Sequence, residues 1–334
     1  MMIRLAAWLA ALWLGTGMAV AECRGADLIE TLPAAERDAI IAAAQAVPYP
    51  SGNLWLARRG EATVTVVGTM HVNDVRNLGF LQRLQARIDA TDLVILEATL
   101  DEIARLEEVI IAEPSIAFIV DGPSLRDQLT PAEWDDLRRE MGARGVPSFM
   151  AGRMQPWLAF VTLSAPACLL EQGAAATVGL DALIEGLANR AGVPVLGLED
   201  YTILFETFDT LSLDESLDIL RATLLIAPYA EDVFATLTNA YFAGEHRLVW
   251  EFSRRWLPAE IEAQIDVPAM QAIFARLEDV LLTNRNLAWM ETLLPLTEAH
   301  SDIVLAVGAA HLSGHDGVLD LLDRAGFALT PLTD

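Results

Sequence analysis

Four short apolar segments constrain the fold of this chain more than any other feature of its sequence. Each is rich in β-branched residues, contains few polar ones, and ends in a residue capable of chemistry. The four segments are residues 62–71, 92–97, 194–199 and 302–311. Near-continuous apolar runs of this length are typical of strands buried on both faces, as in a parallel sheet that is covered by helices.

Helical patterns lie between these segments, and the alternation predicts the fold class. Apolar residues recur at helical spacing over 78–90 and 179–191, and a predicted strand follows each of these ranges. Alternating helices and strands are characteristic of α/β folds with right-handed crossovers. We therefore expect an α/β fold in which helices flank a central, mainly parallel sheet. The order His, Glu, Glu, His at the strand ends further suggests two related halves.

The later part of the chain predicts a second kind of structure. Residues 202–297 show amphipathic helical spacing throughout, interrupted only by proline and glycine. We interpret this range as a helical cap region beside the sheet. Since no Gly/Ser-rich linker divides the chain, we expect residues 22–334 to form a single domain.

Residues 1–21 have the pattern of a cleaved secretory signal peptide. Arg4 precedes an apolar run, and the small residues Ala19 and Ala21 frame the expected cleavage site after Ala21. An uncleaved N-terminal anchor is the alternative. No later charge-free apolar stretch reaches the roughly 18 residues that a span needs, so we expect no stable membrane insertion after cleavage. The expected location is periplasmic or secreted.

The two cysteines, Cys23 and Cys168, both remain after the expected cleavage. An oxidising compartment permits them to pair, which would fasten the new N-terminus to the body of the protein. The alternative is two separate thiols, with Cys168 buried in the helical run 163–170.

All 22 basic residues are arginine, and the chain contains no lysine. This absence excludes Schiff-base chemistry, pyridoxal-phosphate attachment, and the lysines of P-loop proteins and kinases. The formal net charge of −25 argues against a nucleic-acid partner, because the phosphates would be repelled over most of the surface.

Two copies of a Gly-x-x-His motif end two of the predicted strands. They are Gly68-Thr-Met-His71 and Gly308-Ala-Ala-His311. The glycine lets the backbone turn off the sheet, and the histidine presents an imidazole as a metal ligand or a general base. A single histidine at a strand end is usually structural, but two copies in matching contexts favour a functional site.

Glu97 and Glu199 end the other two predicted strands. A carboxylate in this position must be paired, hydrogen-bonded or bound to metal, so an internal ion pair with an arginine remains an alternative to a site role. Ligands of open α/β sheets lie outside the carboxyl ends of the strands, so we expect two histidines and two glutamates at one edge. Such a ligand set suits Mn²⁺, Zn²⁺, Fe²⁺ or Co²⁺.

Three further positions are candidates with simple alternatives. Arg285, between two asparagines in an apolar helix, would bind a substrate carboxylate or stabilise an oxyanion, or else lie on the surface. Asp181 lies at a helix start, where capping alone would explain it. Gln155 precedes Pro156-Trp157 at the beginning of another expected helix.

The ordered set of these elements resembles a known family. The elements are Gly68-Thr69-x-His71, the Glu97 strand, Gln155-Pro156-Trp157, Gly179-Leu180-Asp181, Gly197-Leu198-Glu199, Asn284-Arg285-Asn286 and Gly308-x-x-His311-x-x-Gly314. Together they resemble the TraB/PrgY/GumN family, which includes the TIKI membrane proteases and is distantly similar to the erythromycin-esterase and ChaN-like group. The resemblance implies an α/β fold with a paired Gly-x-x-His and glutamate site.

For TIKI relatives the resemblance implies a divalent-metal-dependent peptidase that uses Mn²⁺ or Co²⁺. Our hypothesis is a hydrolase of peptides or of other amides or esters, in which His71, Glu97 and His311 hold the ion. Glu199 would be the general base, unless it too is a ligand, and Arg285 would stabilise the oxyanion or anchor the substrate.

Gln155 and Asp181 are the candidate substrate-binding residues, and Gln155 stands where the family often has lysine. The alternatives to a hydrolase are a non-catalytic binding protein for haem or a signalling peptide, and an accessory protein of an export or polysaccharide system.

Overall fold

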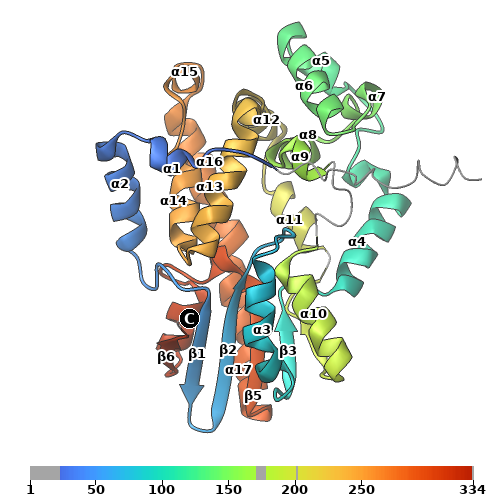
Figure 1. Cartoon of the computed structure of the whole chain (residues 1–334). Helices are drawn as coiled ribbons and strands as arrows, with labels where there is room; N and C mark the ends of the chain where they lie inside the picture. The colour runs from blue at the N-terminus through green and yellow to red at the C-terminus, as the bar shows by residue number, and fades with distance from the viewer. Residues whose placement is uncertain (1–22, 171–177, 201, 333–334) are drawn as a thin grey trace, which may run out of the picture.

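A mixed β-sheet forms the centre of the computed structural model, which describes residues 23–170, 178–200 and 202–332 (Figure 1). Within these ranges the sheet has six strands in the order β4-β3-β5-β2-β1-β6. Their bounds are β1 (Leu54–Arg59), β2 (Ala62–Thr69), β3 (Leu93–Leu96), β4 (Val195–Gly197), β5 (Asp302–Gly308) and β6 (Ala328–Pro331). The predicted signal peptide lies outside the described residues.

Four neighbouring strands of the sheet are parallel, as the apolar segments predicted. β2 and β3 each pair in parallel with β5, and β4 pairs in parallel with β3. β1 is antiparallel to β2 and to β6. The sequence did not predict β1 and β6. β1 is a short strand that ends in two arginines and contains no long apolar run, and β6 is largely exposed. The expected mainly parallel sheet of an α/β fold is thus confirmed, with an antiparallel strand added at one side.

Helices cover both faces of the sheet and extend beyond its carboxyl edge (Figure 1). In the first part of the chain their bounds are α1 (Leu28–Thr31), α2 (Ala34–Gln45), α3 (Asn77–Ile88), α4 (Leu100–Ala112), η1 (Pro114–Ile116), α5 (Leu125–Gln128), α6 (Pro131–Ala143), α7 (Ser148–Ala151), α8 (Pro156–Ser164), α9 (Ala167–Leu170) and α10 (Leu180–Ala191). In the second part they are α11 (Ile203–Asp209), α12 (Leu213–Ile226), η3 (Ala227–Tyr229), α13 (Ala230–Phe242), α14 (His246–Arg255), α15 (Ala259–Glu262), α16 (Val267–Glu278), η4 (Asp279–Thr283), α17 (Asn284–Ala299), η5 (Ala309–His311) and α18 (Val318–Arg324).

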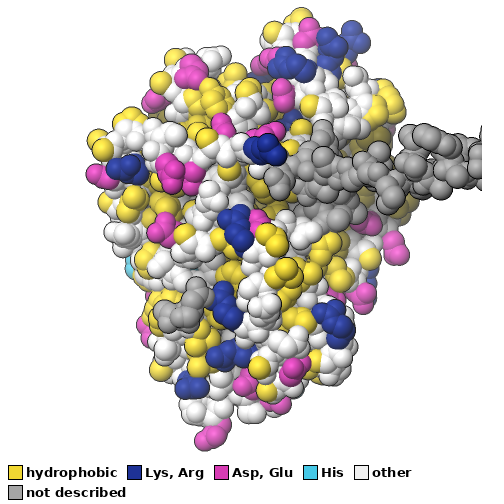
Figure 2. All heavy atoms as spheres, viewed as in Figure 1, with side chains coloured by type: hydrophobic (Ala, Val, Ile, Leu, Met, Phe, Trp, Pro, Cys, Tyr) yellow, Lys and Arg dark blue, Asp and Glu magenta, His cyan; other side chains and the backbone are white. Residues whose placement is uncertain are grey.

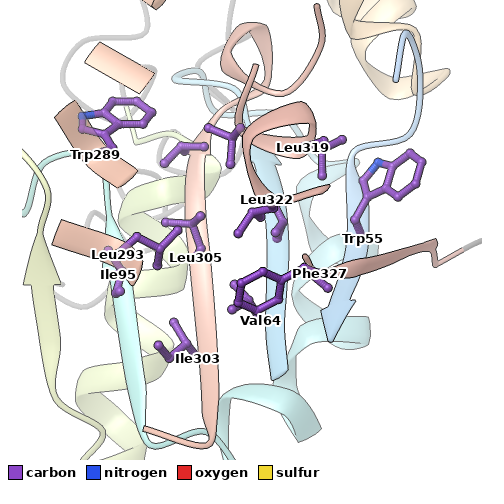
Figure 3. Packing of buried hydrophobic residues seen from close by; sticks show 14 of the residues in the cluster. Trp55, Val64, Ile95, Trp289, Leu293, Ile303, Leu305, Leu319, Leu322 and Phe327 are labelled. Carbon is purple, nitrogen blue, oxygen red and sulfur yellow. The ribbon is translucent and has the colours of Figure 1, made fainter. Parts of the chain in front are cut away.

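The alternation of side chains along each strand divides the core into two layers. Val64 and Val66 of β2 face α17 and α18, where Trp289, Leu293 and Leu319 lie (Figure 3). The other face of the sheet packs against α3 and α10 through Val67 and Val304 of the strands and Phe80, Leu84, Leu180 and Ile184 of the helices. Successive strand residues point to opposite faces. Because both faces of the sheet are apolar, helices must cover both faces to bury them.

A helical layer lies beyond the carboxyl edge of the sheet, at the top of Figure 1. Helices from both halves of the chain build it, since α8 packs with α12 and α2 packs with α14. The predicted cap range 202–297 is helical where it is described, but α17, its last helix, covers a sheet face instead. No helix among the described residues combines the length and the apolar character that crossing a membrane requires.

Charges of both signs are mixed over the face of the molecule that Figure 2 shows, where arginine and acidic side chains are interspersed. Several arginines form ion pairs with a carboxylate within four residues, among them Arg138 with Asp135 and Arg221 with Asp218. Exposed pairs of this kind contribute little to stability. Local pairing therefore offsets part of the acidic excess on the surface.

The predicted disulfide is present and joins the N-terminal segment to α9. Cys23 and Cys168 are separated by 145 positions in the sequence, and their Cα atoms lie 5.4 Å apart. A covalent bond across so long a loop removes conformational entropy from the unfolded chain. The bond therefore holds the beginning of the described chain against the helical layer.

Replacing both cysteines by serine should lower the free energy of unfolding by about 2–5 kcal/mol, because the unfolded chain regains its loop entropy. Urea denaturation with and without dithiothreitol measures the change. The native protein in reductant should behave like the double variant, which should not respond to reductant. Equal stability of the oxidised protein and the variant would contradict the prediction.

The buried carboxylate of Glu251 is the centre of an ion-pair network on α14. The Glu251 side chain is 1% exposed and accepts hydrogen bonds from Arg247 at 2.6 Å and from Arg254 and Arg255 at 2.8 Å. Arg247 also reaches Glu278 of α16 at 3.2 Å. Burial opposes ionisation of Glu251, but the hydrogen bonds from Arg254 and Arg255 and the charge of Arg247 lower its pKa to about 2. The network therefore holds α14 in one orientation.

Glu251→Gln should lower the free energy of unfolding at neutral pH by about 1–3 kcal/mol, since it leaves the buried Arg247 with Glu278 as its one charged partner among the contacts described above. A pKa held below its ordinary value of 4.5 gives stability that is present above that value and is lost toward pH 2. The difference between the native protein and the variant should therefore shrink as the pH falls below about 4.5. Asp135→Asn, which breaks an exposed pair, is the control and should cost less than about 1 kcal/mol.

Candidate functional site

The four predicted site residues lie at the carboxyl ends of four adjacent parallel strands. Glu199 follows β4, Glu97 follows β3, His311 follows β5 in η5, and His71 follows β2. The strand register aligns Thr69 of β2 with Gly308 of β5, so the two Gly-x-x-His turns leave the sheet at the same level. The structure therefore brings these four residues to one edge of the sheet.

Gly308 forms the floor on which three of these side chains converge. A Cβ atom built on Gly308 would lie 3.3 Å from Oε2 of Glu97, 3.4 Å from Cδ2 of His311 and 3.6 Å from Nε2 of His71. The Gly308 N–H group donates to Oε2 of Glu97 at 3.1 Å. A side chain at position 308 would thus occupy the space between the three groups.

His71 is held from the opposite side by the first turn of α10. Its Nδ1 atom lies 3.1 Å from Oδ1 of Asp181, and its side chain is 58% exposed. The backbone of the two segments also touches, since Leu180 donates to the Met70 carbonyl at 3.1 Å. A Cβ on Gly179 would lie 2.6 Å from the His71 Cα, which explains the glycine. The hydrogen bond to Asp181 raises the pKa of His71 to about 9, although burial opposes it.

Asp181 therefore has a role that capping does not explain. The N-cap residue of α10 is Gly179, and no side chain caps this helix. Asp181 instead accepts a hydrogen bond from the Nδ1–H group of His71 and leaves the Nε2 atom of that ring directed toward Gly308. Carboxylate partners of this kind fix the tautomer and the orientation of an imidazole.

His311 is held in the same way but in a buried setting. It is 4% exposed, and its Nδ1 atom lies 2.7 Å from Oδ1 of Asn286. Its Nε2 atom lies 3.9 Å from Oε2 of Glu97. Burial lowers the pKa of His311 to about 3, so the ring is neutral at physiological pH. Because Nδ1 donates to the amide oxygen, we assign the tautomer whose Nε2 carries a lone pair, which Nη1 of Arg285 approaches to 3.4 Å.

Arg285 of α17 lies between the two glutamates. Its Nε and Nη2 atoms donate to the two oxygens of Glu199, each at 2.6 Å, and Nη2 also donates to Oε1 of Glu97. Its Nη1 atom donates to the Leu281 carbonyl at 2.9 Å and lies 3.4 Å from Nε2 of His311. The guanidinium group therefore has partners on all three nitrogens and forms an internal ion pair with both carboxylates.

The two glutamates differ in how much of each is engaged. The Glu199 side chain is 6% exposed and accepts a further hydrogen bond from Trp289 at 2.8 Å. The Glu97 side chain is 17% exposed and turns Oε2 toward the histidines. Burial opposes ionisation of Glu97, but the positive charges of His311, which is protonated only at low pH, and of Arg285 and His71 hold its pKa at about 2. Cationic partners thus keep Glu97 ionised at physiological pH in spite of its burial.

A π-helical segment places Arg285 at the sheet edge. η4 (Asp279–Thr283) directly precedes α17, and its Leu281 carbonyl is the one that accepts from the guanidinium. Such segments shift the register of the helix that follows, and they are frequent at functional sites. The motif Asn284-Arg285-Asn286 begins at this shift, which aims both Arg285 and Asn286 at the sheet.

The site opens into a cavity of about 380 Å³ between the strand ends and the helical layer. Its lining residues are Thr69, Met70, His71, Glu97, Leu237, Tyr241, His246, Val249, Trp250, Leu281, Leu282, Arg285, Gly308, Ala309, Ala310 and His311. A second cavity of about 190 Å³ lies on the Glu199 side and shares Glu97, Leu281 and Arg285 with the first. The ion pair of Arg285 and Glu97 thus separates the two cavities.

Gln155 does not join these residues. It is the N-cap of α8, and its side chain donates to the Ser115 carbonyl at 3.0 Å. It lines neither of the two cavities described above. The neighbouring Trp157 donates to the Ile116 carbonyl at 3.0 Å, so this element holds the 114–117 segment in place.

The residues at the edge have the chemistry of a metal site but do not form one as they stand. Among the described parts of the chain, no three His, Cys, Asp or Glu side chains are grouped so that they could hold a metal ion. Arg285 instead contacts Glu97 and lies beside His311. The donor set still fits a divalent ion, because Nδ1 partners orient both imidazoles and Glu97 offers Oε2 to the same space.

Several residues of the site were not predicted from the sequence. Asn286 and Trp289, which orient His311 and Glu199, project from α17 one helical turn apart. The Asn-Arg-Asn pattern marked that turn but did not show its partners. Nothing in the sequence around Thr69 or Trp250 predicted that these residues would line the cavity.

Arg285→Gln should lower the free energy of unfolding by about 3–5 kcal/mol, because it leaves two buried carboxylates without a counter-charge. Arg285→Lys keeps the charge but not the two-pronged geometry, so its effect should be smaller yet clear. Urea denaturation measures both variants. Arg276→Gln, which breaks a pair whose arginine is 45% exposed, should cost less than about 1 kcal/mol. An Arg285→Gln protein as stable as this control would contradict the prediction.

Comparison with known proteins agrees with the motifs. A search of curated proteins finds no match. A family model, described as the TraB/PrgY/gumN family, matches residues 53–331. The matched range contains all the described strands and every residue of the site. The chain belongs to the TraB/PrgY/gumN family.

Proposed function

We propose that this protein is a metal-dependent hydrolase of peptides or of other amides or esters. One observation carries the proposal: two imidazoles, each fixed through Nδ1 by an oxygen from another element, converge on Oε2 of Glu97 beside Gly308. Nε2 of His71 faces Gly308, and Nε2 of His311 lies 3.9 Å from that carboxylate oxygen. Two histidines and one carboxylate are a common ligand set for divalent ions.

His71, Glu97 and His311 would hold the ion, with Mn²⁺ or Co²⁺ implied by the family resemblance and Zn²⁺ or Fe²⁺ as further candidates. When bound, such an ion polarises a carbonyl group and lowers the pKa of a water molecule. Asp181 would hold the proton on Nδ1 of His71, whose Nε2 must lose its proton when the ion binds, and Asn286 would hold the proton on Nδ1 of His311. His71, the most exposed of the three, would face incoming substrate.

Glu199 and Arg285 have a more structural role in this proposal than their sequence positions alone suggested. Glu199 accepts from Arg285 and Trp289, and Arg285 has all its nitrogens engaged. We therefore assign to this pair the positioning of Glu97, rather than the general-base and oxyanion roles. The network holds one carboxylate oxygen of Glu97 and leaves the other toward the histidines.

The disulfide supports an oxidising location for this activity. Cys23 lies close to the expected cleavage site after Ala21, and its bond to Cys168 is compatible with an extracellular or periplasmic protein. We propose that the hydrolase acts in that compartment.

Gly308→Ala tests the proposed site without removing any ligand. The added methyl group should enter the space between Glu97, His311 and His71 and weaken Mn²⁺ binding about tenfold or more, while the fold remains intact. Isothermal titration of the EDTA-treated protein with MnCl₂ measures the affinity, and thermal unfolding checks the fold. Gly79→Ala on α3, where a Cβ meets no atom within 4 Å, is the matched control and should bind like the native protein.

Loss of the hydrogen bond that orients His71 should also weaken metal binding. Asp181→Asn should reduce metal affinity by about 10- to 100-fold, and hydrolysis of a peptide library should fall with it. His71→Ala should abolish both. A native protein that takes up none of the four metals and hydrolyses no peptide with them present would overturn the proposed function.

A further inference from the structure

A further cavity, of about 200 Å³, lies in the helical layer and apart from the sheet edge. Its walls are formed mainly by α12, α14 and α16, which lie above the sheet in Figure 1. It shares no lining residue with the two cavities beside Arg285. Its wall is mostly apolar and includes Ile219, Ala222, Ile226, Trp256, Met270 and Phe274. Such a wall favours an apolar guest, because binding removes apolar surface from water.

The hydroxyl groups of this cavity are engaged within their own helices. The Thr223 hydroxyl donates to the Ile219 carbonyl at 2.8 Å, and the Ser253 hydroxyl donates to the Val249 carbonyl at 2.9 Å. The one side-chain amide of the wall belongs to Gln271, which is exposed. A peptide inside the cavity would leave most of its main-chain N–H groups without partners, which is costly. A hydrocarbon chain has no such groups, so it suits the cavity better.

Two arginines give one end of the cavity a positive charge, although acids outnumber arginines in this chain by 47 to 22. Arg254 and Arg255 line the cavity at the end of α14, and within the described parts of the chain no acidic side chain lines it. Both arginines share Glu251 with Arg247, which also pairs with Glu278. The network sets three positive charges against two negative ones. The surplus favours an anion at this end.

Arg255 is the arginine best placed to meet such an anion. Its side chain is 43% exposed, and its Nε atom donates to Glu251 at 2.8 Å. Its two Nη groups donate to no other residue that the structure describes. They can therefore form a charge-assisted hydrogen bond with an anion while the bond from Nε to Glu251 stays in place.

The acidic neighbourhood of the cavity fixes the direction in which an anion would lie. Three of its apolar residues, Ile265, Met270 and Ile273, also line a neighbouring cavity of about 430 Å³. The charged residues of that neighbouring cavity are Glu133, Asp136, Asp218, Asp266 and Arg221, so its charge is mainly negative. An amphipathic anion should therefore place its charged end at Arg255 and its apolar end toward the three shared residues.

We propose that the cavity between α12, α14 and α16 binds an unbranched fatty acid of medium chain length, with its carboxylate at Arg255 and its chain among the apolar side chains. An apolar cavity of about 150 Å³ holds benzene, so this one has room for roughly eight carbon atoms. The site lies outside the proposed metal centre, and its ligand does not depend on the proposed hydrolase activity.

Isothermal titration of the purified protein with octanoate tests the proposal. Octanoate should bind at least tenfold more tightly than octylammonium, because the arginines attract its carboxylate and repel an amine. It should also exceed the dipeptide N-acetyl-Ala-Leu at least tenfold, since the cavity has no partners for amide groups. Equal binding of octylammonium, or no binding of octanoate, would overturn the proposal. Tighter binding of the dipeptide would assign the cavity to a peptide end and would also overturn it.

Chain length separates a closed cavity from adsorption to the surface. From butanoate to octanoate the affinity should rise about fourfold for each added methylene group, or on the order of 100-fold in all. From octanoate to dodecanoate it should rise little, because the cavity is already filled. An affinity that keeps rising fourfold per methylene group up to dodecanoate would contradict the assignment to this cavity.

Arg255→Gln tests the charged end. It should weaken binding of octanoate about tenfold and leave binding of octanol unchanged, because octanol carries no charge. Arg276→Gln, at an arginine of α16 that is 45% exposed and pairs with Glu215, is the matched control and should change neither affinity. Native octanoate affinity in Arg255→Gln would overturn the placement of the carboxylate.

Ala222→Leu tests the apolar end. Ala222 is 7% exposed and lines the cavity from α12, so a larger side chain should fill the space and weaken octanoate and octanol alike at least tenfold. Ala272→Leu, at an exposed position of α16 outside the lining residues, is the matched control and should bind like the native protein. Thermal unfolding checks that both variants fold. Native octanoate affinity in a folded Ala222→Leu protein would place the binding elsewhere and overturn the proposal.

Discussion

The guanidinium group of Arg285 is the contact on which the site depends. It joins α17 to the ends of β3 and β4 through two carboxylates, and burial alone would drive the one on Glu97 toward its neutral form. Each partner makes the others possible, since an arginine or a glutamate left alone at this depth would be strongly destabilising. The same contact fixes the Oε1 atom of Glu97 and so determines what its Oε2 atom faces.

The strands of the sheet could be predicted from the sequence because burial on both faces leaves a visible trace. A run such as 302–308 has no polar face, so it identifies itself as central and parallel. β6 leaves no such trace because it lies at the edge and is largely exposed. The residues that end the central strands were found for the same reason, since a His or Glu after an apolar run is conspicuous.

The partners of these residues could not be predicted, because they depend on contacts between distant segments. Arg285 meets Glu97 across 188 positions, and Asp181 meets His71 across 110. The sequence left open whether Glu199 pairs with an arginine, and the structure shows that it does. Asp181 and Gln155 had equal standing as candidates, yet only Asp181 contacts the site.

The long separations between these partners bear on when the site can form during synthesis. Neither Arg285 nor His311 has been made when β2, β3 and β4 are complete, and β5 must still insert between β2 and β3. Until then Glu97 and Glu199 lack the charge of Arg285, and His71 lacks the second histidine, His311. Any activity of this edge is therefore a property of the finished chain, and an incomplete one would be inert.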